Sequence, residues 1–401
     1  MKKTVGVLTG VVFFLLFPLH AQVDPIQRDS LQLGFEQPLE GRNPLSAYAF
    51  YYHNQPNFLE TNLTLRLAIA PVYLDSELAF VGLLGPTTDL GIGVSGGAFA
   101  DDYNEFHDGH FYQNQSFDGH SATVSASLYH LFNPADRIPL NLVVRGSVHY
   151  AAYVPDETAP NFVVPDDQTS FSVRTGLRFG GIEPTLYPAL AMEISVWYEG
   201  QFRTAPNYYG FNDDRYVQPE SHLFWTREAL CYTFAKSKQS IAAQFQAGAS
   251  IDPDRFSAYR LGGELPMSSE FPLSLPGYFF DEFSAREFVL FNASYFVPLD
   301  HAKQWNLHAD ASTAVVDYLP GTGQPGNSLT SVGGGLLFRS KDDRWKLLLD
   351  YGYGVDAVRT GGRGGNSISL LVQLDLDKIR SPWFHPLQPG FWHGLGSAFG
   401  L

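Results

Sequence analysis

Apolar and polar side chains alternate with a period of two from about residue 60 to near the C-terminal end of the chain. In residues 344–356, one face carries Trp345, Leu347, Leu349, Tyr351, Tyr353 and Val355. The opposite face carries Lys346, Leu348, Asp350, Gly352, Gly354 and Asp356. A period of two is the pattern of a β-strand with one apolar face. The chain is therefore predicted to be all-β.

The alternating segments are long, and their second face is polar. Most span about 10 to 14 residues, which is typical of a tilted strand that crosses a bilayer rather than a strand of a soluble sandwich. Fifteen segments are predicted, near 47–55, 60–70, 76–85, 88–100, 120–132, 140–153, 169–182, 189–202, 222–235, 239–250, 286–299, 304–318, 327–340, 344–358 and 367–377. Closed bacterial barrels have even strand numbers. We therefore expect a transmembrane antiparallel β-barrel of about sixteen strands.

The connections between these segments differ in length. NPADRIP (133–139) and SKDDR (340–344) are short, whereas residues 101–118, 154–168 and 204–220 are long. Short periplasmic turns and long extracellular loops are typical of outer-membrane barrels. A soluble β-sandwich or propeller is the weaker alternative, because its strands would be shorter and no blade-length repeat is present.

The N-terminus adds an export signal to this pattern. Lys2 and Lys3 precede the apolar run Val5–Leu19, and Ala21 is a candidate cleavage point, as in a secretory signal peptide. The predicted organisation is a signal peptide at 1–21, a short lead at 22–46, the barrel at 47–379 and a turn-rich tail at 380–401. No periplasmic domain is expected before the barrel.

Composition excludes several functional classes. The formal net charge is −15, and removal of Lys2 and Lys3 would leave about −17, which argues against nucleic acid as a partner. Cys231 is the single cysteine, so neither an internal disulfide nor a cysteine-based metal cluster is expected.

Motifs with the outline of catalytic or cofactor sites lack their structural context. GIGVSGG (91–97) fits a nucleophile elbow and a dinucleotide fingerprint, but no helical pattern follows it. TGGRGG near Arg363 lacks the Lys-Ser/Thr element of a phosphate loop. Glu193 and Glu199 are explained by a polar lumen, and His107 and His110 by a solvated acidic loop. The chain is predicted not to be an enzyme, with no catalytic residue, no cofactor and no metal site.

The segment RLGGELPMSSEFPLSLPGYFFDEFSAREF (260–288) precedes the last five alternating segments. It resembles the lumen loop of the BamA/TamA and two-partner-secretion superfamily of outer-membrane barrels, together with the strand pattern of residues 255–377. The resemblance rests on Arg260, Leu261, Gly262 and Gly263, on Leu275, Pro276, Gly277 and Tyr278, and on residues 288–300. It implies that this segment folds toward the lumen, and that Asp310 is the inward-facing partner of the loop.

Two positions depart from the family pattern. Pro276 stands where the family has a loop arginine, and Ser312 stands where it has a glycine. The family's ion pair to Asp310 therefore cannot form in the same way. Our hypothesis is that Arg260 or Arg286 satisfies Asp310, which shares its inward face with Asn306, His308 and Ser312.

The resemblance implies a role in inserting or translocating proteins at the outer membrane, with a weak seam between the first and last strands. The expected partners are outer-membrane lipid and lipopolysaccharide, together with β-barrel or secreted protein cargo. The alternative is a passive channel or a structural barrel that has lost the insertion activity.

Overall fold

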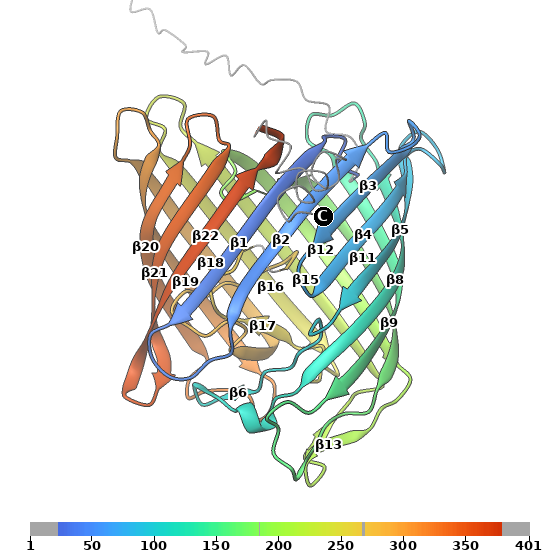
Figure 1. Cartoon of the computed structure of the whole chain (residues 1–401), viewed down its shortest axis with the longest axis vertical. Helices are drawn as coiled ribbons and strands as arrows, with labels where there is room; N and C mark the ends of the chain where they lie inside the picture. The colour runs from blue at the N-terminus through green and yellow to red at the C-terminus, as the bar shows by residue number, and fades with distance from the viewer. Residues whose placement is uncertain (1–22, 184, 267–268, 379–401) are drawn as a thin grey trace, which may run out of the picture.

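The computed structural model describes residues 23–183, 185–266 and 269–378. In this part of the chain, sixteen antiparallel strands close into a barrel (Figure 1). The barrel strands are β1 (Arg28–Pro38), β2 (Ser46–Pro56), β3 (Leu63–Ile69), β4 (Tyr73–Phe80), β5 (Thr88–Gly97), β8 (Asp118–Leu131), β9 (Leu140–Val154), β11 (Gln168–Gly181), β12 (Leu190–Arg203), β15 (Glu220–Thr233), β16 (Ser240–Ile251), β18 (Phe283–Pro298), β19 (Trp305–Tyr318), β20 (Ser328–Arg339), β21 (Trp345–Arg359) and β22 (Gly362–Asp375). The predicted all-β barrel is confirmed.

Shorter elements lie in the connections. They are β6 (Phe106–His107), β7 (His110–Phe111), β10 (Phe162–Val163), β13 (Tyr208–Phe211), β14 (Arg215–Tyr216) and β17 (Tyr259–Leu261), with the 3₁₀ turns η1 (Gln113–Gln115) and η2 (Leu376–Lys378). Among the described residues, no helix is long and apolar enough to cross a membrane.

Strand β1 closes the barrel and corrects the expected boundary at residue 47. It pairs with β2 on one edge and with β22 on the other, where Ser30–Pro38 faces Ser367–Asp375. Only three outward positions of β1 are apolar: Leu31, Leu33 and Phe35. This pattern is too short to mark a strand in the sequence, so the sequence predicts a lead before the barrel in this region. The predicted signal peptide at 1–21 and the predicted tail at 380–401 lie outside the described residues.

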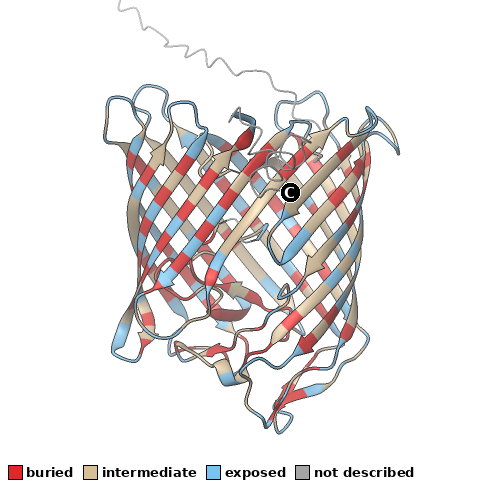
Figure 2. Cartoon of the chain, viewed as in Figure 1, coloured by how far each residue is buried: buried red, intermediate tan, exposed pale blue. Residues whose placement is uncertain are grey.

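The two faces of the barrel wall follow the alternation in the sequence. On β21, Trp345, Leu349 and Tyr351 are exposed on the outer surface, whereas Lys346 and Asp350 are buried inside. Bands of buried and exposed residues run across neighbouring strands (Figure 2). An apolar exterior and a polar interior are what a lipid-facing barrel requires.

The long connections gather at one end of the barrel, where Figure 1 labels β6 and β13. They cover that end with an aromatic cluster of Tyr103, Phe117, Tyr153, Phe162, Tyr209, Val217 and Phe256. Beneath it, Glu105 pairs with Arg255 at 3.0 Å and with Arg215 at 3.3 Å. Burial of Glu105 opposes its ionisation, but the two arginines outweigh burial and lower the pKa of this carboxyl.

Candidate functional site in the barrel interior

The connection between β16 and β18 contacts the inner wall of the barrel. Strand β17 pairs with the start of β18, and Gly262 and Gly263 then turn the chain with φ angles of +136° and +69°. Leu275 N–H donates to the Gly263 carbonyl at 2.9 Å, so the returning chain pairs with the outgoing one. The segment 259–283, here called the inner segment, is anchored by Leu261, Leu275, Tyr278, Phe279 and Phe283, each at most 1% exposed.

The tip of the inner segment lies against β21 and β22. Gly277 N–H donates to Ser367 Oγ at 3.0 Å, and the Tyr278 hydroxyl donates to the Thr330 carbonyl at 3.0 Å. A Cβ added to Gly352 would lie 2.6 Å from both Gly277 N and Pro276 Cβ. Glycine in β21 is therefore what lets the backbone of the tip approach the wall.

A buried ion pair fixes the inner segment to β21, and the sequence analysis missed it. Arg359 donates to both carboxylate oxygens of Glu282, at 2.8 and 3.0 Å, and both side chains are at most 4% exposed. The Arg359 guanidinium also lies 3.8 Å from the ring centroid of Phe279. Two parallel hydrogen bonds of this kind are strong and geometrically specific. Here the acid lies on the inner segment and the base on the wall.

The hypothesis that Arg260 or Arg286 satisfies Asp310 is wrong. Arg260 donates to Ser284 Oγ at 2.5 Å and to the Asn104 carbonyl at 2.8 Å. Arg286 pairs with Asp317 at 2.5 Å, and both are about half exposed. Arg286 cannot reach Asp310 because it lies at the loop-side end of β18, beside a register shift between Ala285 and Glu287.

The other predicted wall residues are Ser312, His308 and Asp310, and each lies close to the inner segment or to another wall residue. Ser312 Oγ accepts from Asn292, whose amide also donates to the Ser274 carbonyl of the inner segment at 2.8 Å. His308 is 2% exposed, and its ring lies between Asp310 and Asp350: Nδ1 is 3.4 Å from Asp310 Oδ1 and Nε2 is 2.9 Å from Asp350 Oδ2.

Glutamates join this histidine and its two aspartates. Glu264 of the inner segment contacts Asp350, and its backbone N–H donates to Glu36 of β1 at 2.6 Å. Burial raises the pKa of Glu264 well above its usual range, and the neighbouring Asp350 carboxylate adds to this effect. We call His308, Asp310, Asp350, Glu264 and Glu36 the acidic cluster.

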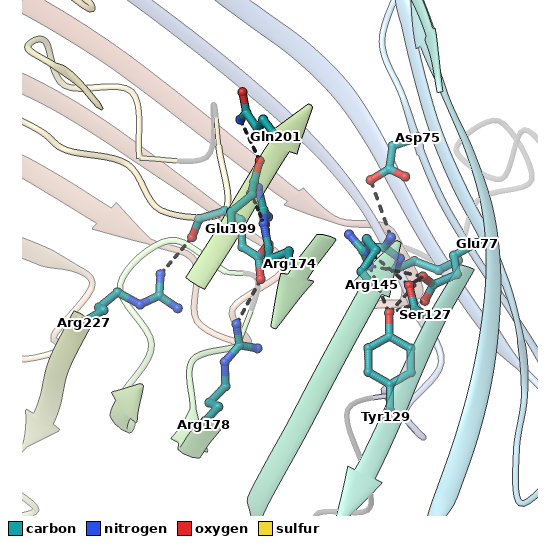
Figure 3. A network of polar contacts seen from close by, with 12 residues as sticks. Asp75, Glu77, Ser127, Tyr129, Arg145, Arg174, Arg178, Glu199, Gln201 and Arg227 are labelled. Atoms are coloured by element: carbon teal, nitrogen blue, oxygen red, sulfur yellow. Dashed lines mark hydrogen bonds and ion pairs between the residues drawn. The ribbon is translucent and has the colours of Figure 1, made fainter. Parts of the chain in front are cut away.

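Charged residues on the opposite wall form a second network (Figure 3). Arg145 donates to Glu77 at 3.2 Å and to Ser127 Oγ at 2.8 Å, while the Tyr129 hydroxyl donates to Glu77 at 2.8 Å. In the same network, Arg174 pairs with Glu199 at 2.6 Å and Arg227 pairs with Glu193 at 2.8 Å. These acids are matched by arginines, unlike those of the acidic cluster.

Glu270 connects the inner segment to this arginine-rich wall. Its carboxylate accepts from Arg178 at 2.9 Å and from Arg174 at 3.3 Å. Burial opposes ionisation of Glu270, but Arg178, Arg174 and Arg145 together outweigh it and lower its pKa to about 2. The inner segment therefore reaches from β21 and β22 across to β11.

The connection between β11 and β12 enters the barrel from the other end. Lys346 donates to the Leu186 carbonyl at 2.7 Å, and Arg339 donates to the Tyr187 carbonyl at 3.2 Å. Leu186 packs in one apolar cluster with Leu265 of the inner segment. Segments from both ends therefore meet inside the barrel.

The wall is incomplete beside β2. Residues Ser46–Phe50 pair with β1, but pairing with β3 covers only Tyr51–Pro56, since β3 ends at Ile69 and β4 begins at Tyr73. Among the described residues, Ser46–Phe50 has no strand partner on its second edge. We call this stretch the free edge of β2; β1 to β4 lie on the side facing the viewer in Figure 1.

A cavity of about 1000 Å³ adjoins the free edge. It is lined by inward-facing Tyr48 and Phe50 and also by outward-facing Ala47 and Ala49. Because both faces of β2 contribute, the cavity passes around the edge of the strand. The inner segment supplies further apolar lining, with Leu265, Phe271, Leu273 and Phe280.

Comparisons with known proteins are informative only at the level of structure. A scan against protein-family models and a search of curated proteins find no match. Among solved structures, CdiB from Acinetobacter baumannii superposes with a TM-score of 0.57 at 10% sequence identity, covering 87% of this chain and 60% of that chain. CdiB from Escherichia coli gives 0.55 at 12% identity, covering 87% of this chain and 63% of that chain.

BamA from Haemophilus ducreyi lacking POTRA domains 1–3 superposes with a TM-score of 0.54 at 11% identity, covering 87% of this chain and 71% of that chain. The chain has the barrel fold of CdiB and BamA. The predicted resemblance to BamA and two-partner-secretion barrels is thus confirmed for the fold. The chain spans less than two thirds of the length of either CdiB chain.

Proposed function

We propose that this chain is an outer-membrane barrel that assists the insertion or translocation of β-rich proteins. The observation that carries the proposal is the free edge of β2, which borders an apolar cavity at a break in the wall. The barrel fold shared with CdiB and BamA supports the same role.

The free edge has the chemistry needed to bind an extended polypeptide. An unpaired strand edge presents main-chain N–H and C=O groups that a second strand can bind. Beside it, Tyr48, Phe50 and Val72 line a cavity able to take alternate side chains of the incoming strand. Neither requirement involves a catalytic group.

This proposal places the opening of the barrel wall between β2 and β3, and not at the expected seam between β1 and β22. The seam between β1 and β22 has nine residue pairs, whereas the β2–β3 pairing has six, the fewest between barrel strands in the described residues. Widening the gap between β2 and β3 therefore breaks fewer strand hydrogen bonds than opening the seam.

The proposed location is the bacterial outer membrane, with the short turns toward the periplasm and the long connections outside. Exposed Val148, Val173 and Val289 illustrate the apolar outer surface, which would contact lipid, with lipopolysaccharide at the outer rim.

Insertion of an unfolded eight-stranded barrel into liposomes tests this function. Liposomes containing the purified chain should accelerate the appearance of protease-resistant, heat-modifiable cargo relative to liposomes that contain a sixteen-stranded porin. Cargo protected inside the vesicles would count as translocation. Equal rates in the two kinds of liposome would contradict the proposal.

The alternative role, a passive channel or structural barrel, has a different basis. The seam is paired throughout Ser30–Pro38, and segments from both ends pack against each other inside the barrel. These features would suit a structural barrel, which would show neither cargo insertion nor appreciable conductance.

A further inference from the structure

We propose that His308, Asp310 and Asp350 bind a divalent transition-metal ion such as Zn²⁺ or Mn²⁺ inside the barrel. Their ligand atoms, one from each residue, all lie within 4.8 Å of one another. The proposal concerns a site separate from the free edge of β2, and it holds whether or not the chain inserts proteins.

The spacing of the three side chains suits a shared ion. With metal–ligand bonds of about 2.0–2.2 Å, neighbouring ligand atoms of one ion lie about 3 Å apart. An ion takes one nitrogen of the imidazole, and His308 Nε2 lies 2.9 Å from Asp350 Oδ2; with one atom from each residue, the three ligand atoms lie within 4.8 Å of one another.

The polar atoms of the site lack hydrogen-bond partners. His308 is 2% exposed, yet neither ring nitrogen makes a well-formed hydrogen bond within the described residues. The same holds for both carboxylate oxygens of Asp310 and for Asp350 Oδ2. A buried polar group without a partner destabilises the fold, and more so when it is charged. A bound cation would satisfy one ring nitrogen of His308 and a carboxylate oxygen of each aspartate together.

The charges of the acidic cluster also call for a cation. In the described residues, no lysine or arginine forms an ion pair with Asp310, Asp350, Glu264 or Glu36. Lys346 and Arg339 instead contact the carbonyl groups of Leu186 and Tyr187. The ionised carboxylates of Asp310 and Asp350 repel one another at low dielectric, and a divalent ion would balance these two charges.

The wall leaves space for the ion-binding side chains. Strand β20 separates β19, which carries His308 and Asp310, from β21, which carries Asp350. A Cβ on Gly333 would lie 2.5 Å from Asp310 Oδ2, and one on Gly335 would lie 2.7 Å from Asp350 Oδ1. The two glycines therefore allow side chains from β19 and β21 to meet over β20.

The ligand set selects the class of metal. One imidazole with two carboxylates suits Zn²⁺, Mn²⁺ or Fe²⁺, whereas Ca²⁺ and Mg²⁺ prefer oxygen ligands alone. Because Glu264 of the inner segment contacts Asp350, an ion here would also hold that segment against the wall. The site is therefore structural, with no proposed catalytic step.

Metal titration of the tag-free barrel tests the site. After dialysis against a chelator in detergent, Co²⁺ titration should give visible absorption that saturates at one ion per barrel. Zn²⁺ should displace Co²⁺ and raise the unfolding temperature, and Ca²⁺ should do neither. His308→Gln should weaken Co²⁺ binding by about tenfold or more, since one of three protein ligands is lost.

A double variant, His107→Gln with His110→Gln, controls for binding at the acidic surface loop and should bind Co²⁺ as the wild type does. Heat-modifiable migration reports whether each variant folds, and Asp350→Asn replaces His308→Gln if the latter does not fold. The proposal is overturned if the wild type binds no transition metal, if Ca²⁺ binds in its place, or if the folded variants retain full binding.

Discussion

At the scale of single residues, Glu282 and Arg359 form a buried link between the inner segment and the wall. Both side chains are nearly inaccessible to water, and the pair is bidentate. Removing one partner of such a pair leaves the other charge buried and uncompensated, which costs about 3–5 kcal/mol.

We therefore predict that Arg359→Met lowers the free energy of unfolding by about 3 kcal/mol or more. Equilibrium urea unfolding in lipid vesicles measures the change. The control is Arg286→Ala, which breaks the exposed pair with Asp317 and should cost less than about 1 kcal/mol. Equal effects of the two variants would contradict the assigned role of Arg359.

Glu270 leads to a prediction about pH. Its pKa falls from an ordinary value near 4.5 to about 2 in the folded chain, so its ionised form stabilises the fold fully above pH about 4.5. That stabilisation is lost as the pH falls toward 2. Because the carboxylate is 46% exposed to the lumen, the contribution is about 1 kcal/mol or less.

The comparison of wild type with Glu270→Gln measures this contribution. The difference in unfolding free energy should be constant above pH about 5 and should vanish between pH about 4.5 and 2. A difference that grows on acidification would have the wrong sign for a carboxylate held by Arg174 and Arg178.

At the scale of elements, the structure explains which parts of the sequence were informative. Fifteen of the sixteen barrel strands are marked by alternation, because one face of each is apolar and lies on the outer surface while the other faces the polar interior. Strand β1 is missed because it has only three outward apolar positions before Pro38. The short β3 and β4 strands are found, but the break they leave beside β2 depends on register, which one strand's pattern does not reveal.

The inner segment is likewise only partly predictable from the sequence. Its glycines and its buried aromatics are visible in the sequence, but its charged partners come from distant strands. Glu282 and Arg359 are separated by 76 intervening residues, and Asp350 meets His308 only because β20 is glycine-rich between them. A local sequence pattern does not predict such pairs, because they form only when distant strands and the inner segment come together in the folded barrel.

The docking of the inner segment on β21 gives a prediction at this scale. Gly352→Val should displace the tip, because even a Cβ would lie 2.6 Å from Gly277 N. We expect faster protease cleavage within residues 264–281 and a loss of stability of about 1–3 kcal/mol from overpacking. Gly146→Ala on β9 is the control, since nothing lies within 4 Å of its added Cβ. Unchanged cleavage in Gly352→Val would contradict the docking.

At the scale of the whole molecule, the sixteen strands form a closed ring with a break beside β2, and segments from both ends meet inside it. The inner segment and the connection at 182–189 meet at Leu265 and Leu186, while the aromatic cluster covers the opposite end. A cavity of about 1000 Å³ adjoins the free edge of β2. The proposed route for a polypeptide is therefore through the wall beside β2, with little flow expected along the axis.

Conductance in planar bilayers should be reduced by the segments that pack inside the barrel. The wild type is expected to conduct little for a sixteen-stranded barrel, and replacing residues 264–281 by a short Gly-Ser linker should increase conductance severalfold. A wild type as conductive as an open porin would favour the passive-channel alternative.

Disulfide locking of the wall in the liposome insertion assay tests the central claim most directly. In a Cys231→Ser background, Tyr51→Cys with Ile69→Cys joins β2 to β3 at the end of the free edge, and Leu33→Cys with Val372→Cys joins β1 to β22. We predict that the β2–β3 lock abolishes accelerated cargo insertion until a reductant is added, while the seam lock leaves most of it. Loss of insertion with the seam lock alone, or full insertion with β2 and β3 joined, would contradict the account.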